Sequence, residues 1–372
     1  MTTSATAGMR LENEVEAPSP ALLIYPNRVE RNLRRMIAIA GSPERLRPHL
    51  KTHKLPQIIA LQVGLGITKC KCATIAEAEM AAGAGVTDIL LAAQLVGPNV
   101  SRFIALQRAF PNVAFSTLVD DPDVLASLSQ AAVLAGVTIE VLLDLDVGQH
   151  RTGIVPGPEA FDLYQKIGFL AGLRPGGLHA YDGHLHQSNR AERAAACDDA
   201  FAGVAALRSE LVRIAQAVPR VVCGGTPTFP IHANHEDVEC SPGTCVLWDA
   251  GYDAKLPDLA FEPAAMLLTR VVSRPLTNRL CLDLGHKSVA SEMPHPRVIF
   301  PDLPDARAVG HNEEHLVLET ARAAAFPVGA VLYGIPWHIC PTVALHDRVQ
   351  VVKGGRITEE WTVTARARRL SF

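Results

Sequence analysis

The feature that most constrains this fold is an alternation of short apolar runs with alanine-rich helical stretches, which continues from about residue 20 to residue 250. Strands that alternate with helices pair in parallel, because each helix returns the chain to the same end of the sheet. Eight runs read as strands of one parallel sheet: residues 45–52, 68–74, 88–94, 113–119, 138–146, 174–182, 220–228 and 237–249. Eight such repeats predict a closed (β/α)₈ barrel of the TIM type, and a doubly wound open sheet is the competing topology.

The pattern changes after about residue 255, where turn residues instead of helices separate short strands. The run "VVKGGRITEEW" reads as a hairpin that turns at Gly354 and Gly355. The fold class that we expect is therefore α/β, a TIM-type barrel with a C-terminal, mainly antiparallel β domain. We place the barrel at residues 21–252 and the β domain at residues 253–372, and we expect residues 1–20 to join the β domain.

The charge balance argues against two classes of partner. The 372 residues carry a net charge of −3, whereas binding to nucleic acid or to an anionic membrane requires a basic face. The first twenty residues lack the basic and then apolar segments of a signal peptide, and no apolar run reaches the roughly 20 residues that span a bilayer. Eight scattered cysteines are typical of reduced intracellular thiols in a chain of this size. We therefore expect a cytoplasmic protein.

Polar residues gather at the carboxyl ends of the predicted strands. In a (β/α)₈ barrel, these ends and the loops that follow them carry the active site. The residues in such positions are Lys51, Thr74, Gln94, Asp144, Asp146, His150, Arg151, His179, Tyr181, Asp182, His184, His186, Gly224, Gly225 and Thr226. So many polar groups at one rim indicate an active site there.

Lys51 stands in the segment "RPHLKTHK", which crowds cationic and imidazole side chains into a chain that is only 20% charged. Burial and cationic neighbours favour the neutral form of a lysine amine, and the neutral amine is the form that makes a Schiff base. A surface lysine at a strand end is the alternative. The density of Arg47, His49, His53 and Lys54 around Lys51 makes it a candidate for a covalent catalytic role.

Two further motifs suggest ligand sites. The glycine-rich turn "CGGTPT", residues 223–228, follows the seventh strand, where such barrels commonly hold phosphate, although an ordinary tight turn is equally consistent. In "WHICPT", His338 and Cys340 are two apart on a predicted strand, so both side chains face one way, as a metal pair requires. Imidazole with thiolate prefers zinc to magnesium or manganese, and a chance core cysteine is the alternative. His184 and His186 form a similar pair.

Taken together, several segments resemble those of a known family. "RPHLKTHK", "CATIAEAEMAAGAG", "RTG" after the fifth strand, "GGTPT" and "WHICPTVALHD" are similar to the D-threonine aldolase and D-serine dehydratase group. These are fold type III enzymes that use pyridoxal 5′-phosphate (PLP) and are related in architecture to alanine racemase. The resemblance extends from about residue 18 to the end of the chain. It implies an N-terminal barrel with a C-terminal β domain, usually as a homodimer, which agrees with the strand count.

The resemblance also implies which residues bind the cofactor. Lys51 would carry PLP on its amine, and Arg151 and Tyr181 would contact the cofactor ring. The remaining contacts that it implies are Thr74 and Gln94 near the ring, and Gly224, Gly225 and Thr226 at the phosphate.

The same resemblance implies a metal-assisted lyase reaction on small-molecule D-β-hydroxy-amino acids. His338 and Cys340 would bind a divalent metal, Zn²⁺ or Mn²⁺, that holds the β-hydroxyl group of the substrate. If His184 or His186 removes the β-hydroxyl proton, the Cα–Cβ bond breaks and D-threonine gives glycine and acetaldehyde. If Lys51 removes the α-proton instead, hydroxide leaves from Cβ and the enzyme is a dehydratase.

One position bears on the choice between these reactions. In this family the aldolases tend to have His–x–Asp with manganese-like metals and the D-serine dehydratases His–x–Cys with zinc, so Cys340 favours the dehydratase. Residues 333–347 and 361–369 are, however, most similar to chains grouped with D-threonine aldolases, and we expect that activity. A 3-hydroxy-D-aspartate aldolase or dehydratase is a related alternative. A zinc hydrolase on a TIM barrel and a non-catalytic PLP carrier are the alternatives from other classes.

Overall fold

The computed structural model describes residues 8–372, which fall into two compact units. The barrel unit holds residues Met36–Lys51, Ile59–Gly243 and Ala367–Phe372. The β unit holds residues 8–35 of the described chain together with Thr52–Ile58 and Thr244–Arg366. The chain passes from one unit to the other several times, and the domain boundaries predicted after residues 20 and 252 stay predictions. Residues 1–7 of the predicted N-terminal segment lie outside the described residues.

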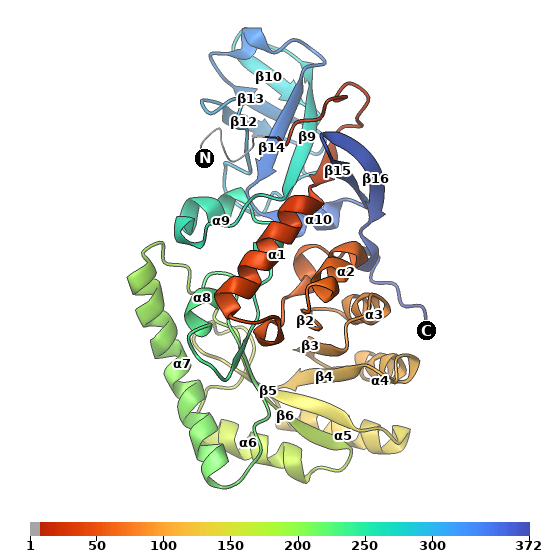
Figure 1. Ribbon diagram of the computed structural model, residues 1–372, viewed down its shortest axis with the longest axis vertical. Coiled ribbons are helices and arrows are strands. Elements are labelled where there is room, and N and C mark those ends of the chain that lie inside the picture. The colour runs from red at the N-terminus through yellow and green to blue at the C-terminus, as the bar shows by residue number, and fades with distance from the viewer. Residues whose placement is uncertain (1–7) are drawn as a thin grey trace. The chain divides into compact units, whose positions relative to one another are not determined.

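Seven parallel strands form the sheet of the barrel unit, and they pair in chain order (Figure 1). These strands are β2 (Lys69–Cys72), β3 (Asp88–Gln94), β4 (Ala114–Val119), β5 (Ile139–Leu145), β6 (Leu173–Ala180), β7 (Val221–Cys223) and β8 (Val238–Cys240). Leu90, Leu118, Leu142 and Val222 from four of these strands pack into one buried cluster. Seven of the eight predicted strands are thus confirmed, in the order that a TIM-type barrel requires.

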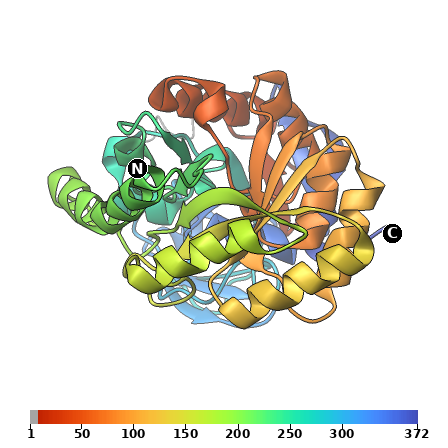
Figure 2. The ribbon, with the colours of Figure 1, turned by 90° about the horizontal axis from the view of Figure 1, so that it is seen from below.

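Helices connect these strands and lie on the outer face of the curved sheet (Figure 2). They are α3 (Ile75–Gly83), α4 (Asn99–Ala109), α5 (Pro122–Ala135), α6 (Pro158–Phe169), α7 (Arg190–Arg213) and the short α8 (Phe229–His232). Local chemistry sets their ends, as α5 shows. The Asp121 side chain accepts N–H groups of the first turn of α5, and Gly136 ends the helix at φ +65°. Two further helices, α1 (Pro26–Ala40) and α2 (Pro56–Gly64), contain residues of both units.

The first predicted strand, residues 45–52, is not a regular strand. Leu46 makes an isolated parallel bridge to Cys240 of β8, and His49 makes another to Lys71 of β2. Pro48 lies between them and has no N–H, so a continuous ladder cannot form there. The two bridges link the two edge strands of the sheet, and the eighth position of the barrel is therefore filled by an irregular segment. Lys51 follows in a 3₁₀ turn, Leu50–Thr52, and does not lie on a strand as predicted.

Arg47 has a structural role in this closing segment. Its guanidinium is fully buried and donates to both carboxylate oxygens of Asp88, at 2.8 and 2.7 Å, and to Glu239 at 2.6 Å. Asp88 is the first residue of β3, so this ion cluster lies at the amino end of that strand. Arg47 is close to Lys51 in sequence, but its two carboxylates hold its guanidinium at the amino end of the sheet, opposite the rim where the candidate residues lie.

The β unit contains a mainly antiparallel sheet, as predicted. Its strands are β1 (Ala21–Ile24), β9 (Ala265–Ser273), β10 (Arg279–Leu282), β11 (Val298–Ile299), β12 (Arg307–His311), β13 (Leu316–Glu319), β14 (Val331–Pro336), β15 (Arg348–Lys353) and β16 (Arg356–Thr362). Within the described part of the β unit, only β1 and β15 pair in parallel. The predicted hairpin is present as β15 and β16, and Gly354 and Gly355 both have positive φ at its turn. Two helices, α9 (Ala250–Lys255) and α10 (Ile339–Leu345), belong to the same unit.

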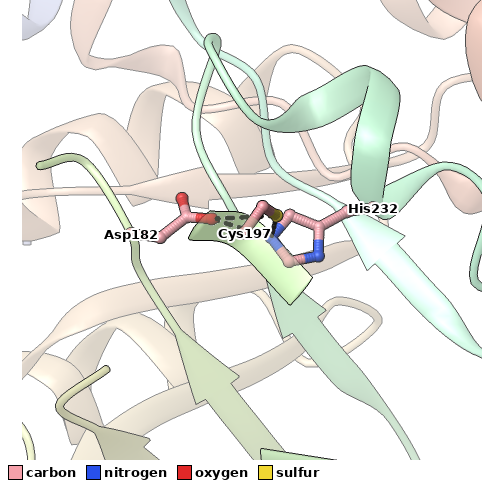
Figure 3. A group of neighbouring side chains, drawn as sticks. All are labelled: Asp182, Cys197 and His232. Atoms are coloured by element: carbon pink, nitrogen blue, oxygen red, sulfur yellow. Dashed lines mark hydrogen bonds and ion pairs between the residues drawn. The ribbon is translucent and has the colours of Figure 1, made fainter. Parts of the chain in front are cut away.

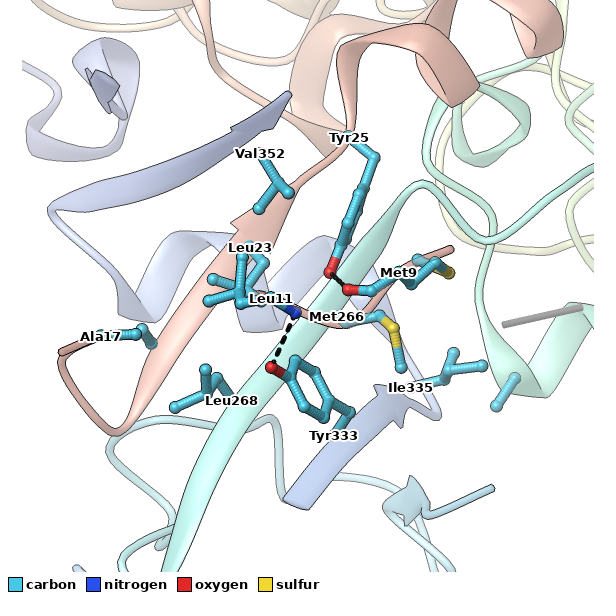
Figure 4. Packing of buried hydrophobic residues seen from close by; sticks show 12 residues of the cluster. Met9, Leu11, Ala17, Leu23, Tyr25, Met266, Leu268, Tyr333, Ile335 and Val352 are labelled. Atoms are coloured by element: carbon cyan, nitrogen blue, oxygen red, sulfur yellow. Dashed lines mark hydrogen bonds between the residues drawn. The ribbon is translucent and has the colours of Figure 1, made fainter. Parts of the chain in front are cut away.

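Residues near the N-terminus contribute to the core of the β unit. Met9, Leu11 and Ala17 pack with residues of β1, β9 and β14, as Figure 4 shows. Tyr25 donates its hydroxyl to the Met9 carbonyl, and the N–H of Leu11 donates to the Tyr333 hydroxyl. Within residues 8–372, no helix is both long and apolar enough to cross a membrane.

Candidate active site

The side chains of two lysines and one arginine lie around one aromatic ring at the rim of the barrel unit. The ring belongs to Tyr181, the residue directly after β6. The Lys51 Nζ atom is 5.6 Å from the ring centroid, Lys71 Nζ is 5.4 Å from it, and the guanidinium carbon of Arg151 is 5.1 Å from it. All three distances are within the range of cation–π contact. The structure thus brings Lys51, Arg151 and Tyr181 together, and the gathered positive charge favours an anionic ligand.

Two glycines leave the space that the Tyr181 ring occupies. A Cβ atom on Gly183 would lie 2.4 Å from the ring and its hydroxyl, and one on Gly225 would lie 3.0 Å from Cε2. Contacts this close would displace the ring, so both positions require the smallest residue. Because Gly225 belongs to the predicted phosphate loop, the position of the ring depends on that loop.

Lys71 is the member of this group that sequence reasoning missed. It lies on β2 between Cys70 and Cys72, is 2% exposed, and its amine is 3.4 Å from Nε2 of His179. His179 lies on β6, and its Nδ1 is 2.6 Å from the carboxylate of Asp144 on β5. The signal that could have identified Lys71 is a lysine inside an otherwise buried strand, because lysine is almost never fully buried without a partner.

The glycine-rich loop "CGGTPT", here called the phosphate loop, follows β7 as predicted. The Gly224 N–H donates to the Ala180 carbonyl at 3.0 Å, and the Gly225 N–H donates to Oγ1 of Thr228 at 3.2 Å. Thr226 is buried, and its hydroxyl accepts the Gly243 N–H at 3.2 Å. The loop is therefore fixed by bonds inside the barrel unit. The N–H groups of Gly224 and Gly225, two of the residues that the resemblance assigns to the phosphate, thus have protein acceptors. The phosphate assignment stays a prediction.

A buried group of Asp182, Cys197 and His232, here called the Asp182 group, stands next to the phosphate loop (Figure 3). Nε2 of His232 is 2.8 Å from Oδ2 of Asp182 and 3.3 Å from Sγ of Cys197. The second carboxylate oxygen of Asp182 accepts the Thr228 hydroxyl at 2.8 Å. Through Thr228, which receives the Gly225 N–H, the group fixes the phosphate loop.

The three ligand atoms of the Asp182 group lie close enough together for a metal ion. Burial, followed by the charge of Asp182, raises the pKa of the Cys197 thiol well above its ordinary value. The sulfur therefore stays protonated, whereas the thiolate is the form of cysteine that binds metal. Both oxygens of Asp182 already accept hydrogen bonds. These features favour an anchoring role for the group.

Thr74 and Gln94 have structural contacts. The Thr74 hydroxyl accepts the N–H of Glu77 and caps α3, and Oε1 of Gln94 accepts the Asp120 N–H at 2.9 Å. Both residues line a cavity of about 240 Å³ that the Tyr181 ring does not line. Their predicted place beside the cofactor ring stays a prediction.

His184 and His186 differ in exposure. His186 is exposed, whereas His184 is half-buried and its Nδ1 atom is buried without a partner among the described residues. A Cβ atom on Gly148 would lie 3.1 Å from Nε2 of His184, so the ring packs against the loop that follows β5. An orphaned nitrogen at a strand rim is a candidate for proton transfer, and it favours His184 over His186 as the base.

His338 and Cys340 lie at the junction of β14 and α10, and the prediction that they share a strand is wrong. The strand ends at Pro336, His338 is the N-cap of α10, and Cys340 lies in its first turn. Pro341 explains the change, because proline is tolerated in the first turn of a helix but interrupts a strand ladder.

The two side chains nevertheless interact, and the interaction favours the thiolate. Burial would raise the pKa of the Cys340 thiol, but the contact with His338 outweighs burial and holds the pKa below its ordinary value. Burial would lower the pKa of His338, but Cys340 and then Glu292 raise it to about 9. Zinc prefers thiolate and neutral imidazole as donors, so a metal bound there would displace the proton that His338 holds.

Sequence reasoning missed the side chains that surround this pair. Glu292 accepts from Nδ1 of His338, and the carboxylate of Asp249 accepts the Ile339 N–H at 3.0 Å. The Cys340 sulfur is 3.2 Å from Oγ1 of Thr52 and 3.5 Å from Oγ1 of Thr244. A carboxylate on the second nitrogen of a metal-binding histidine fixes its tautomer, and Glu292 has that position.

Two families match adjacent parts of the chain. Residues 24–249 match the family described as "Alanine racemase, N-terminal domain". Residues 264–352 match the family described as "Putative serine dehydratase domain". An alanine racemase-type barrel followed by such a β domain, with a lysine at its rim, defines the class of fold type III PLP enzymes.

Relatives over almost the full length place the chain within that class. It is 36% identical over 360 residues to a D-threonine aldolase of an Arthrobacter species, and this match covers 95% of this chain and 93% of the relative. It is 28% identical over 371 residues to a 3-hydroxy-D-aspartate aldolase of Paracoccus denitrificans, and this match covers 96% of this chain and 94% of the relative. The crystal structure of D-threonine aldolase from Filomicrobium marinum matches with a TM-score of 0.87 at 30% identity. The match covers 96% of this chain and 98% of the aldolase chain.

The chain belongs to the D-threonine aldolase and D-serine dehydratase family and is a PLP-dependent lyase. Family membership sets aside the zinc hydrolase and the non-catalytic PLP carrier as alternatives.

The residues of the barrel rim fit PLP. The cofactor needs a lysine amine, an aromatic surface and compensation for its anionic phosphate. Lys51, the Tyr181 ring and the guanidinium of Arg151 supply these three properties within one group of contacts. Gly183 and Gly225 have no side chains, and the Tyr181 ring occupies the space that side chains at these positions would fill.

The residues around Cys340 fit a divalent metal. Their donors are one thiolate, one imidazole and nearby carboxylates, and the lowered pKa of the thiol is what a metal ligand requires. The Asp182 group offers the same residue types with a protonated sulfur, and fits less well.

Proposed function

We propose that this protein is a D-threonine aldolase, dependent on PLP and a divalent metal, that cleaves D-threonine to glycine and acetaldehyde. The observation that carries the proposal is the position of Lys51 and Arg151 around the Tyr181 ring. The near full-length similarity to a D-threonine aldolase supports the choice of substrate.

In this proposal Lys51 carries PLP, and Tyr181 and Arg151 orient the cofactor ring. When bound, PLP supplies an electron sink for the negative charge that develops at Cα of the substrate. Gly224, Gly225 and Thr226 provide the phosphate loop, which the Asp182 group fixes in place through Thr228.

His338 and Cys340 hold the metal, and a metal bound there supplies Lewis-acid polarisation of the substrate's β-oxygen. The thiolate favours zinc over manganese. His184 takes the proton of the β-hydroxyl group, since its half-buried ring has an unpartnered nitrogen, whereas His186 is exposed. Departure of that proton allows the Cα–Cβ electrons to move toward Cα as the aldehyde leaves.

One observation favours a second candidate function, D-serine or 3-hydroxyaspartate dehydration. Cys340 stands where aldolases of this family tend to have Asp, and the His338 contact favours its thiolate. A zinc ion held by thiolate would assist departure of hydroxide from Cβ after loss of the α-proton.

The test is to load the purified protein with PLP and either Zn²⁺ or Mn²⁺, add D-threonine, and identify the products. Glycine with acetaldehyde is the expected result. Ammonia with 2-oxobutanoate would replace the aldolase by the dehydratase. The same assay with 3-hydroxy-D-aspartate ranks the related substrates, and L-threonine is the stereochemical control.

We also propose that the protein is a homodimer and cytoplasmic. These expectations rest on the family resemblance and on composition. Sedimentation of the PLP-loaded protein tests the dimer, and a single species of monomer mass would contradict it.

A further inference from the structure

Lys71 is a second lysine at the Tyr181 ring, and no role has been assigned to it above. It is 2% exposed, and among the described residues its side-chain amine lies 3.4 Å from Nε2 of His179, with no carboxylate in hydrogen-bond contact. Burying an ammonium without a carboxylate partner costs several kcal/mol, so a lysine in this position favours its neutral form.

The Asp144–His179 pair determines how His179 meets Lys71. A carboxylate only accepts, so Nδ1 of His179 carries the proton that is shared with Asp144 at 2.6 Å. Burial and then Lys71 lower the pKa of His179, so its ring stays neutral and its Nε2 presents a lone pair. Lys71 therefore donates one N–H to His179. In the neutral amine this orientation leaves the Lys71 lone pair available to another group.

The electrostatics agree with this geometry. Burial, and then the charge of Lys51, lower the pKa of Lys71 to about 7. The titratable groups that face Lys71 come from the Lys51 turn, β5, β6 with its following loop, and β7. They are Lys51, Asp144, His179, Tyr181, Asp182 and Cys223. An amine that titrates near neutral pH is well suited to general acid–base catalysis, because both of its forms are populated.

We propose that Lys71 is a catalytic acid–base residue that takes a proton from the ammonium group of the incoming amino acid. The N–H bond of the ammonium breaks, its electron pair stays on the substrate nitrogen, and the proton binds to the lone pair of Lys71 Nζ. The product amine recovers a proton from Lys71 when it leaves, so the cycle is balanced without a further reactant. The inference rests on the proposed amino-acid substrate.

The experiment uses the PLP-loaded protein and glycine, which has no Cα–Cβ bond and so reports binding and proton transfer without the cleavage step. The rate at which glycine changes the absorbance of bound PLP is measured by rapid mixing from about pH 6 to about pH 9. The variants are Lys71→Met, which removes the amine at similar length, and Lys71→Arg, which keeps a charge that does not titrate. Lys69→Met is the matched control, since Lys69 lies on the same strand but pairs with Glu239.

In the wild-type protein the rate should rise with pH and level off near pH 7. Near neutral pH we expect Lys71→Met and Lys71→Arg to be about 100-fold slower, since acid–base groups contribute about 10²–10⁴-fold. Their rates should rise only at higher pH, where the amino acid loses its own proton. Added methylamine should restore part of the rate in Lys71→Met, and Lys69→Met should behave as the wild type.

Borohydride reduction and peptide mapping give a readout that does not depend on rate. The reduced pyridoxyl group should be on Lys51 in the wild type and in both Lys71 variants. A wild-type rate and pH profile in Lys71→Met would overturn the proposal, and so would a pyridoxyl group found on Lys71. If Lys71→Met does not fold, Lys71→Arg decides by the same criterion. Failure of D-threonine cleavage with normal glycine binding would remove the proposed function and leave the role of Lys71 standing.

Discussion

Two cysteine–histidine groups of this molecule contain the same residue types and have opposite electrostatics. In the Asp182 group, burial raises the pKa of Cys197 and its sulfur stays protonated. In the pair formed by His338 and Cys340, a direct contact lowers the pKa of Cys340 and raises that of His338 to about 9. Residue type alone therefore does not make a metal site. What separates the two groups is the balance at the sulfur: the contact with His338 outweighs burial at Cys340, whereas burial and the charge of Asp182 both raise the pKa of Cys197.

The largest expected effect sharpens this comparison on the Cys340 side. Replacing His338 or Cys340 by Ala removes one of the two proposed metal ligands, and we expect loss of bound metal with at least about 100-fold lower turnover of D-threonine. Metal content per chain and product formation measure the two effects. A Cys340→Ala protein that keeps its metal would move the metal to another site, and the Asp182 group would be the first candidate.

Replacing Asp182 by Asn should weaken PLP binding by about tenfold and leave metal content unchanged. The change removes the charge from bonds to Thr228 and His232, and bonds to a charged group contribute about 1.5–3 kcal/mol each. Titration of PLP absorbance measures the affinity. Asp146→Asn is a matched control, since Asp146 bonds its own loop at His150. Metal loss in Asp182→Asn would break the distinction between the two groups.

Cys197→Ala should lower the free energy of unfolding by about 1–2 kcal/mol, because it removes a buried sulfur that packs with Leu185 and Ile231. Denaturant unfolding of the PLP-loaded protein measures this change. We expect metal content and turnover to stay close to those of the wild type. A Cys197→Ala protein without metal would contradict the anchoring role.

The smallest expected effect concerns thiol chemistry. Because burial raises the pKa of Cys197, its thiolate fraction stays low through neutral and mildly alkaline pH, and iodoacetamide should not modify it in the folded protein. Peptide mapping before and after addition of denaturant measures the difference. Modification of Cys197 in the native state at neutral pH would show that its environment is not the apolar one described here.

Much of the fold could be predicted from the sequence. The seven parallel strands and the β15–β16 hairpin follow from local patterns, because apolar runs, turn glycines and helix caps act over a few neighbouring residues. The placement of Lys51, Arg151 and Tyr181 at one rim also followed, since a barrel brings the carboxyl ends of its strands together.

The remaining features depended on contacts between distant residues. Local pattern placed His338 and Cys340 on a strand, whereas Pro341 and the Asp249 bond to Ile339 begin a helix there. The pattern of residues 45–52 predicts a strand, whereas the structure has two isolated bridges there, at Leu46 and His49. Such outcomes are decided by partners far along the chain, which no short window of sequence contains.

The sequence by itself determined the barrel, the antiparallel sheet and the lysine that the family resemblance assigns to PLP. The tertiary structure decided which charged side chains are buried and with whom. Arg47 is neutralised by Asp88 and Glu239, whereas the Lys71 amine has a neutral imidazole as its hydrogen-bond partner. Both are cations in buried segments, and only the packing of distant strands distinguishes a structural ion cluster from an amine poised to titrate. Desolvation and nearby charge set that difference, and both are properties of the folded state.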